Sequence, residues 1–137
     1  MLSLFATKVI YVFVIAVVLA ILEIQIEGKH GWAEKLPAWR PSKDRLLVRL
    51  FTKLANQKEF TGYHFFLNIF LLLMFHMPFI WHGGWNIYAQ FELLSFYFVF
   101  IAVWDFLWFI LNPERSLNDF NPKKVWWHKK WWGKLPR

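Results

Sequence analysis

The sequence has no cysteine among its 137 residues, and only 18% of them are charged. Disulfide bonds, thiolate metal sites, iron–sulfur clusters and cysteine nucleophiles are therefore excluded. The scarcity of charge accompanies a large apolar content, with 58% hydrophobic and 22% aromatic residues. Such a chain is too apolar for an ordinary soluble domain of this length. The aromatic excess is typical of a protein that contacts the membrane interface, where amphipathic rings concentrate.

Several catalytic and binding motifs are also absent. The chain has no G-x-S-x-G, P-loop, H-E-x-x-H or G-x-G-x-x-G sequence, so serine-hydrolase, nucleotide-binding and zincin chemistry have no support. No nucleic-acid-binding motif occurs either, although the net charge is +7. Because the basic residues flank the apolar segments, we expect anionic lipid headgroups as their partner, and no nucleic acid.

Three long apolar runs predict three transmembrane helices, at about residues 4–26, 62–81 and 87–111. No secretory cleavage site follows the first run, which favours an uncleaved signal anchor. The sequence HGGWN, residues 82–86, is expected to turn the chain between the second and third spans. The fold prediction is one all-α integral membrane domain over residues 1–137.

The polar segment between the first two spans contains a further helical pattern, at about residues 42–58, with Ser42 as the expected N-cap. Five apolar residues share one face: Leu46, Leu47, Leu50, Phe51 and Leu54. The opposite face is basic, with Arg45, Arg49 and Lys53. A basic amphipathic helix of this kind is expected to lie on an anionic membrane surface; packing on a partner protein is the alternative.

The distribution of lysine and arginine predicts the orientation in the membrane. The first loop carries eight of these residues, the tail at 113–137 seven, the N-terminal flank one and the second loop none. By the positive-inside rule, a multi-pass protein of the cell membrane with this pattern has its first loop and tail in the cytoplasm and its N-terminus outside. The tail is also rich in tryptophan, and its expected membrane-surface cations are Lys123, Lys124, Lys129 and Lys130.

Counting residues outward from Gly84 places polar groups of the second and third spans at matching depths. His76 is eight residues before Gly84, and Glu92 is eight after it. His64 is twenty residues before it, and Asp105 is twenty-one after it. An antiparallel hairpin of these spans would therefore hold two His–carboxylate pairs, about 18 Å apart. Ionisable groups in hydrocarbon cost ~3 kcal/mol or more each, so such partners are expected.

Six ionisable residues should meet near the cytoplasmic face, because their segments all reach it. They are Glu23, Glu27, His30, His64, Asp105 and His128. The first three are spaced four and three residues apart, so that they share one face of a helix. Carboxylates and imidazoles without thiols suit iron, manganese or zinc. The sequence therefore predicts a divalent-metal site, in which Glu27 and His30 have the Glu-x-x-His spacing of di-iron bundles.

The leading hypothesis is a small membrane metalloprotein, and an enzyme acting on a lipid-soluble substrate is one form that it could take. The main alternative is a non-catalytic accessory or anchoring subunit of a larger membrane complex, in which the polar residues bind neighbouring helices. A homo-oligomer that binds haem through His64 and His76 is a further alternative. So is an oligomeric proton or ion pathway along the ladder of His–carboxylate pairs. Each polar residue also has a simpler interpretation as a hydrogen-bonded structural group.

Overall fold

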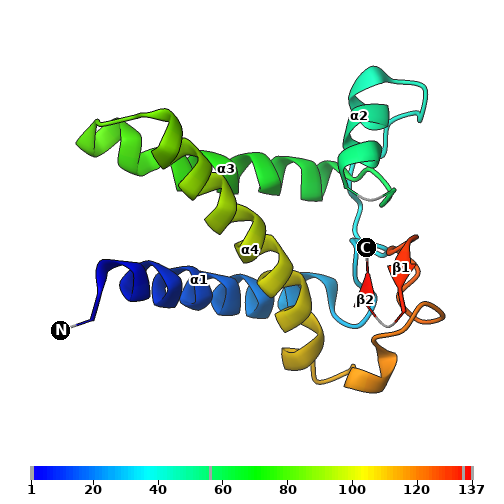
Figure 1. Cartoon of the computed structure of the whole chain (residues 1–137). Helices are drawn as coiled ribbons and strands as arrows, with labels where there is room; N and C mark the ends of the chain where they lie inside the picture. The colour runs from blue at the N-terminus through cyan, green and yellow to red at the C-terminus, as the bar shows by residue number, and fades with distance from the viewer. Residues whose placement is uncertain (1, 56, 134, 137) are drawn as a thin grey trace.

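The structure is a computed structural model that describes residues 2–55, 57–133 and 135–136. Its elements, in chain order, are α1 (Leu4–Glu27), α2 (Leu46–Leu54), α3 (Gly62–His82), α4 (Ile87–Leu111), the 3₁₀ helix η1 (Leu117–Asp119), and the two-residue strands β1 (Trp131–Trp132) and β2 (Leu135–Pro136) (Figure 1). The three long helices have mean hydropathies of 2.7, 1.6 and 2.1 and are long enough to cross a membrane. The prediction of three long apolar helices is confirmed, whereas the short antiparallel β pair was not expected.

Side-chain caps set the first residue of each long helix. Ser3, Thr61 and Asn86 each accept a hydrogen bond from the backbone N–H three residues later. Such bonds satisfy N–H groups that have no partner within the helix. Helices α1 and α3 are followed by Gly28 and Gly83, whose φ angles of +60° and +66° turn the chain away from the helix axis.

Helix α4 packs mainly against α1 and only sparsely against α3. Ala16 and Ala20, one turn apart on α1, are fully buried, and small residues at this spacing allow two helix backbones to approach closely in a membrane. Phe100 and Trp104 of α4 belong to the same core. Helix α4 therefore packs chiefly on α1. The comparison of residue numbers on either side of Gly84 had assumed instead that the second and third predicted spans pack together.

Helix α2 is shorter than the predicted helix at 42–58. Its N-cap is Arg45, which makes no side-chain cap bond. The Ser42 hydroxyl donates instead to the Asp44 carboxylate, with 2.7 Å between the oxygens, so the predicted Ser42 cap is wrong. Local side-chain bonds of this kind compete with helix formation. Asn56, within the predicted range, lies outside the described residues.

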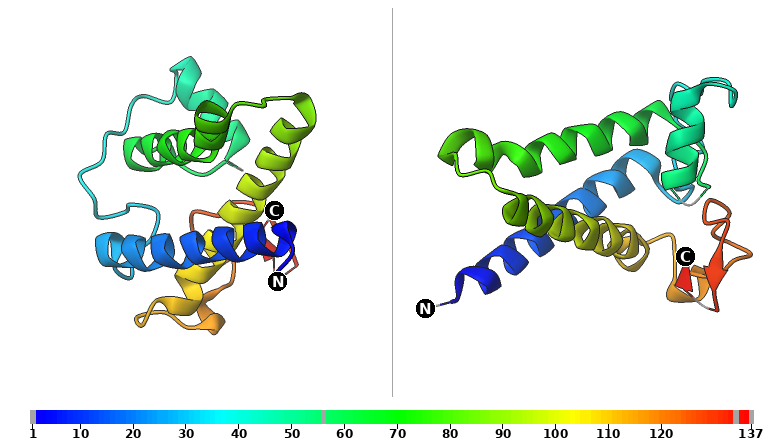
Figure 2. Two further views of the ribbon diagram at one scale, coloured as in Figure 1. Left: turned by 90° about the vertical axis from the view of Figure 1, so that its left-hand side faces the viewer. Right: turned by 45° about the horizontal axis from the view of Figure 1, so that its top comes forward.

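The apolar face of α2 is largely uncovered. Val48 is the buried residue of this helix. Four of the five residues in the predicted stripe are exposed: Leu46, Leu47, Leu50 and Leu54. Helix α2 runs crosswise to α3, at the same end of the molecule as the tail (Figure 2). A helix placed in this way is suited to lie along a membrane surface, and that location stays a prediction.

The tail contributes to the protein interior. Val125 and Trp127 are 0% and 2% exposed, and they form a second core with Ile24 of α1 and with Trp108 and Phe109 of α4. The Trp127 ring stacks on the Phe109 ring, with centroids 5.8 Å apart. The sequence does not predict this core, because a tryptophan-rich tail is equally typical of a membrane interface.

The seven cations predicted at the membrane surface are all exposed. They are Arg45, Arg49, Lys53, Lys123, Lys124, Lys129 and Lys130. Lys124 donates to Asp119 at 2.6 Å, and this hydrogen bond lowers the pKa of the Asp119 carboxyl. Two further tail cations, Lys134 and Arg137, lie outside the described residues. Exposure suits contact with anionic headgroups, which stays a prediction for these side chains.

Gly31 lies where the tail approaches the loop after α1. A Cβ added there would be 2.7 Å from the Trp127 ring, and the φ angle of Gly31 is +64°. Gly28 has a φ angle of +60° but open space around its Cβ position. We expect Gly28→Ala to lower the free energy of unfolding by ~1–2 kcal/mol, because of its left-handed φ. Gly31→Ala should cost a further ~1–3 kcal/mol through overpacking. Unfolding in detergent measures both variants, and equal losses would contradict the close Gly31–Trp127 approach.

Candidate metal centre

Three ionisable side chains meet where the end of α1 lies beside the start of α3. Glu23 and Glu27 come from the last two turns of α1, and His64 comes from the first turn of α3. His64 Nε2 is 3.5 Å from Glu23 Oε1 and 3.4 Å from Glu27 Oε1. The three residues are 8%, 7% and 3% exposed. One ligand atom from each lies within 4.8 Å of the others, so this Glu–Glu–His cluster could hold a metal ion.

Two neighbours fix the orientation of His64. The Thr61 hydroxyl lies 2.7 Å from His64 Nδ1, and the Trp32 ring stacks on the imidazole with 3.8 Å between centroids. The Thr61 oxygen has two lone pairs, so it can accept from both the His64 backbone N–H and Nδ1–H. In that tautomer Nε2 presents a lone pair to the two glutamates, as a metal ligand requires.

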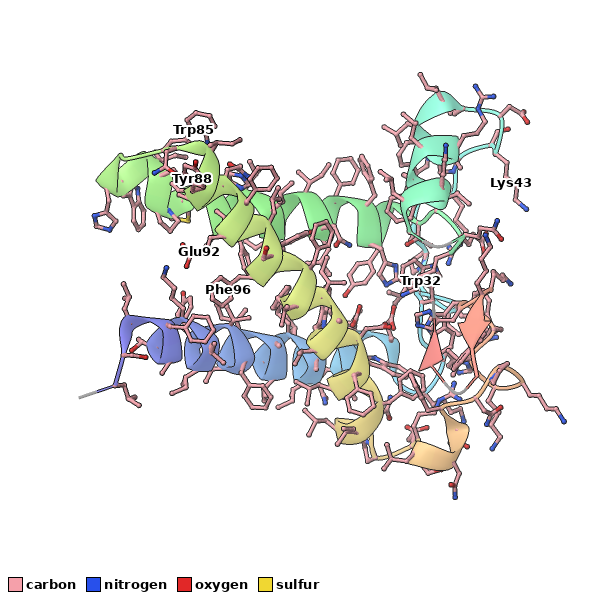
Figure 3. The ribbon with its side chains drawn as sticks, in the orientation of Figure 1. Trp32, Lys43, Trp85, Tyr88, Glu92 and Phe96 are labelled. Atoms are coloured by element: carbon pink, nitrogen blue, oxygen red, sulfur yellow. The ribbon has the colours of Figure 1, made fainter. Side chains whose placement is uncertain are left out.

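The loop after α1 brings Trp32 over His64 through a strained backbone. Figure 3 shows Trp32 at the end of the molecule that also holds α2 and the tail. Trp32 and Ala33 have φ angles of +48° and +51°, in the left-handed region that non-glycine residues rarely occupy. The Ala33 N–H donates to Glu27 Oε1, and the Trp32 indole N–H donates to the Glu59 carbonyl at 2.8 Å. Strain of this kind persists only where surrounding contacts hold it, and it is common at ligand sites.

Asp105 and His128 form a second polar group, which does not belong to the Glu–Glu–His cluster. His128 Nε2 is 2.9 Å from Asp105 Oδ2, and Lys58 Nζ is 3.5 Å from Asp105 Oδ1. The Lys58 ammonium also lies 4.4 Å from the centre of the Trp32 ring. The expected His64–Asp105 pair is therefore replaced by two groups with separate partners. Lys58 and Trp32 connect them, and the sequence singled out neither residue.

His30 also lies apart from the cluster. Its Nδ1 is 3.5 Å from Glu34 Oε2, and the two side chains are 36% and 42% exposed. Helix α1 ends before Gly28, so His30 does not continue the helical stripe that carries Glu23 and Glu27. The structure therefore does not bring His30 to the other predicted ligands, because the helical spacing on which that prediction depended stops too early.

His76 and Glu92 have partners other than each other. His76 Nδ1 is 2.7 Å from the Leu72 carbonyl, and its Nε2 is 3.0 Å from the Gln90 amide. Glu92 pairs with Lys8 of α1 at 2.6 Å and points from α4 toward α1 in Figure 3. His76 and Glu92 were expected to pair with each other, directly or through one water, but each has its own partners because α4 packs on α1 and brings Lys8 within reach of Glu92.

The donor set of the Glu–Glu–His cluster suits a divalent cation. Carboxylates and imidazole are ligands of iron, manganese and zinc. The two N···O separations are longer than the roughly 2.7–3.2 Å typical of an N–H···O hydrogen bond. A tetrahedral ion with bonds of about 2.0–2.1 Å separates its ligand atoms by about 3.4 Å, which matches them. No family model, curated protein or solved structure matches the chain.

Proposed function

We propose that the chain is a membrane metalloprotein that binds iron, manganese or zinc through Glu23, Glu27 and His64, and that it acts as an enzyme on a lipid-soluble substrate. The observation that carries this proposal is the placement of three buried ligand atoms within 4.8 Å of one another. Two buried carboxylates beside one imidazole are costly to keep ionised without a further cation. A metal ion would balance their charge.

The number of ligands supports a catalytic ion over a structural one. Structural zinc sites use four protein ligands, whereas catalytic sites use three and keep a position for water or substrate. The cluster has three ligand residues among those described. It also lies at the ends of two helices that are long and apolar enough to cross a membrane. If they do cross one, a substrate dissolved in the bilayer would reach the cluster without crossing the aqueous phase.

Elemental analysis of the purified full chain, with any affinity tag removed, tests this proposal. We expect about one iron, manganese or zinc ion per chain, with zinc the first to examine because of the ligand spacing. A protein that carries no stoichiometric metal, and binds none when each of the three ions is added, would refute it.

A non-catalytic subunit of a larger membrane complex is the second candidate function. It is favoured by the low burial of α3, since only 11% of its most apolar window is covered within the chain. A helix surface of this kind suits contact with neighbouring transmembrane helices as well as with lipid. Purification with a fixed set of partner chains and without metal would favour this function over the first.

The haem and ion-pathway alternatives have less support from the geometry. A haem iron would need a free nitrogen of His76, whose two nitrogens already contact Leu72 and Gln90. An ion ladder would need successive His–carboxylate pairs, whereas Glu92 pairs with Lys8. We therefore propose neither function.

We further propose that the first loop and the tail face the cytoplasm, because these two segments of the sequence carry fifteen of the sixteen lysines and arginines. The described parts of both segments lie at the same end of the molecule (Figure 1). The chain has no native cysteine, so single cysteines can be labelled without background. An impermeant thiol reagent added to intact cells should label the Gly84→Cys variant and spare Lys43→Cys and Lys129→Cys. Labelling of either lysine position from outside would overturn this orientation.

A further inference from the structure

A cavity of 530 Å³ lies between α2, the segments that precede and follow it, and the tail. It shares no lining residue with the Glu–Glu–His cluster, so its interpretation does not depend on the metal proposal. Its charged lining residues are Arg40, Lys43, Arg49, Lys53, Lys129 and Glu59. The volume is within the range of about 300–1,000 Å³ found for small-molecule sites.

Positive charge dominates this cavity. Five cations against the single carboxylate of Glu59 leave an excess of four positive charges. Within the part of the chain that the structure describes, none of these five cations forms an ion pair with a carboxylate. Arg40 is held in place by donating to backbone carbonyls of the preceding loop. Like charges repel when they are gathered in this way, so an anion would stabilise the arrangement.

The rest of the cavity wall includes apolar and aromatic side chains. Val48 and Phe60 are each 3% exposed and line it from α2 and from the segment before α3. Trp126 lines it from the tail, and Lys129 Nζ lies 5.5 Å from the centre of the Trp126 ring. A cationic site with an apolar wall is suited to an anionic group attached to an apolar body.

We propose that this cavity binds a phosphate group, carried either by the headgroup of an anionic phospholipid or by a free phosphate compound. Arginine and lysine are the side chains that bind phosphate most effectively, arginine through paired N–H donors and lysine as a point charge. The exposed leucines of α2 lie on the same helix as two of the cations. The cavity cations should therefore contribute more to phosphate binding than equally exposed cations elsewhere.

The test compares two double variants that remove equal charge from the same two segments. Arg49→Gln with Lys129→Gln removes two cavity cations, whereas Arg45→Gln with Lys130→Gln removes two exposed cations that do not line the cavity. Native mass spectrometry of the full chain in detergent measures the binding of phosphatidylglycerol and of phosphatidylcholine. We expect the cavity variant to bind phosphatidylglycerol about thirtyfold more weakly than the wild type, and the control variant within about threefold of it.

Inorganic phosphate identifies the source of the bound group. Displacement of phosphatidylglycerol by phosphate, but not by sodium chloride at equal ionic strength, would assign the cavity to free phosphate compounds. Resistance to both salts in the wild-type chain would assign it to the lipid headgroup. Equal weakening in the two double variants would overturn the proposal, as would equal binding of the two lipids by the wild type with no displacement by phosphate.

Discussion

Glu23→Gln, Glu27→Gln and His64→Ala, made one at a time, should each reduce the metal affinity of the purified protein by at least about a hundredfold. Each change removes one of the three ligands that lie within 4.8 Å of one another. Glutamine keeps the shape of glutamate but loses the negative charge that a divalent cation requires. Elemental analysis after purification and dialysis should therefore find little metal in any of the three variants.

Matched controls for these variants are available in the same region. His30 and Glu34 pair with each other and are partly exposed, away from the cluster. His30→Ala and Glu34→Gln should therefore retain the metal content of the wild type. Metal retained in His64→Ala at the wild-type level, or lost equally from His30→Ala, would show that the ion is held elsewhere.

Trp127→Ala should lower the free energy of unfolding by about 3–5 kcal/mol, the usual cost of truncating a large buried aromatic side chain. Trp127 is 2% exposed and packs with Trp108 and Phe109 of α4. Its removal would leave a cavity between the tail and the end of α4. Circular dichroism during denaturant unfolding in detergent measures this loss.

Trp85→Ala is the control for the tail variant. Trp85 is 60% exposed at the turn between α3 and α4, so its truncation should change the free energy of unfolding by only about 0.5 kcal/mol or less. If Trp127→Ala is as stable as Trp85→Ala, the tail does not pack on the helices, and the second core is absent in solution.

Helical periodicity and apolar length were sufficient to predict the three long helices and part of the site. Continuous apolar runs can be recognised without tertiary information. Glu23 and Glu27 share a helix face at the end of α1, and the positive-inside rule placed them near the level of His64. The expected partner of His64 was Asp105, because the second and third spans were assumed to pack together. Which helices pack together depends on contacts between residues that are distant in the sequence. In the structure, Asp105 contacts His128 instead of His64.

The residues that surround the cluster could not be predicted in the same way. Trp32 reaches His64 only because Trp32 and Ala33 adopt positive φ angles, which no local sequence signal indicates for residues of these types. Lys58 lies in an irregular segment, and its contacts to Trp32 and Asp105 arise only when the first loop folds back. The small-residue pair Ala16 and Ala20 is a sequence signal for a close helix contact, but it does not identify α4 as the partner helix.

The most direct test of the metal site is the X-ray absorption spectrum at the edge of the bound metal in tag-free protein. The account predicts nitrogen and oxygen ligands at about 2.0–2.2 Å, with the scattering pattern of a single imidazole. That imidazole contribution should come from His64, and it should be absent from any metal reconstituted into His64→Ala. A spectrum without an imidazole ligand, or one that His64→Ala leaves unchanged, would contradict a site built from Glu23, Glu27 and His64.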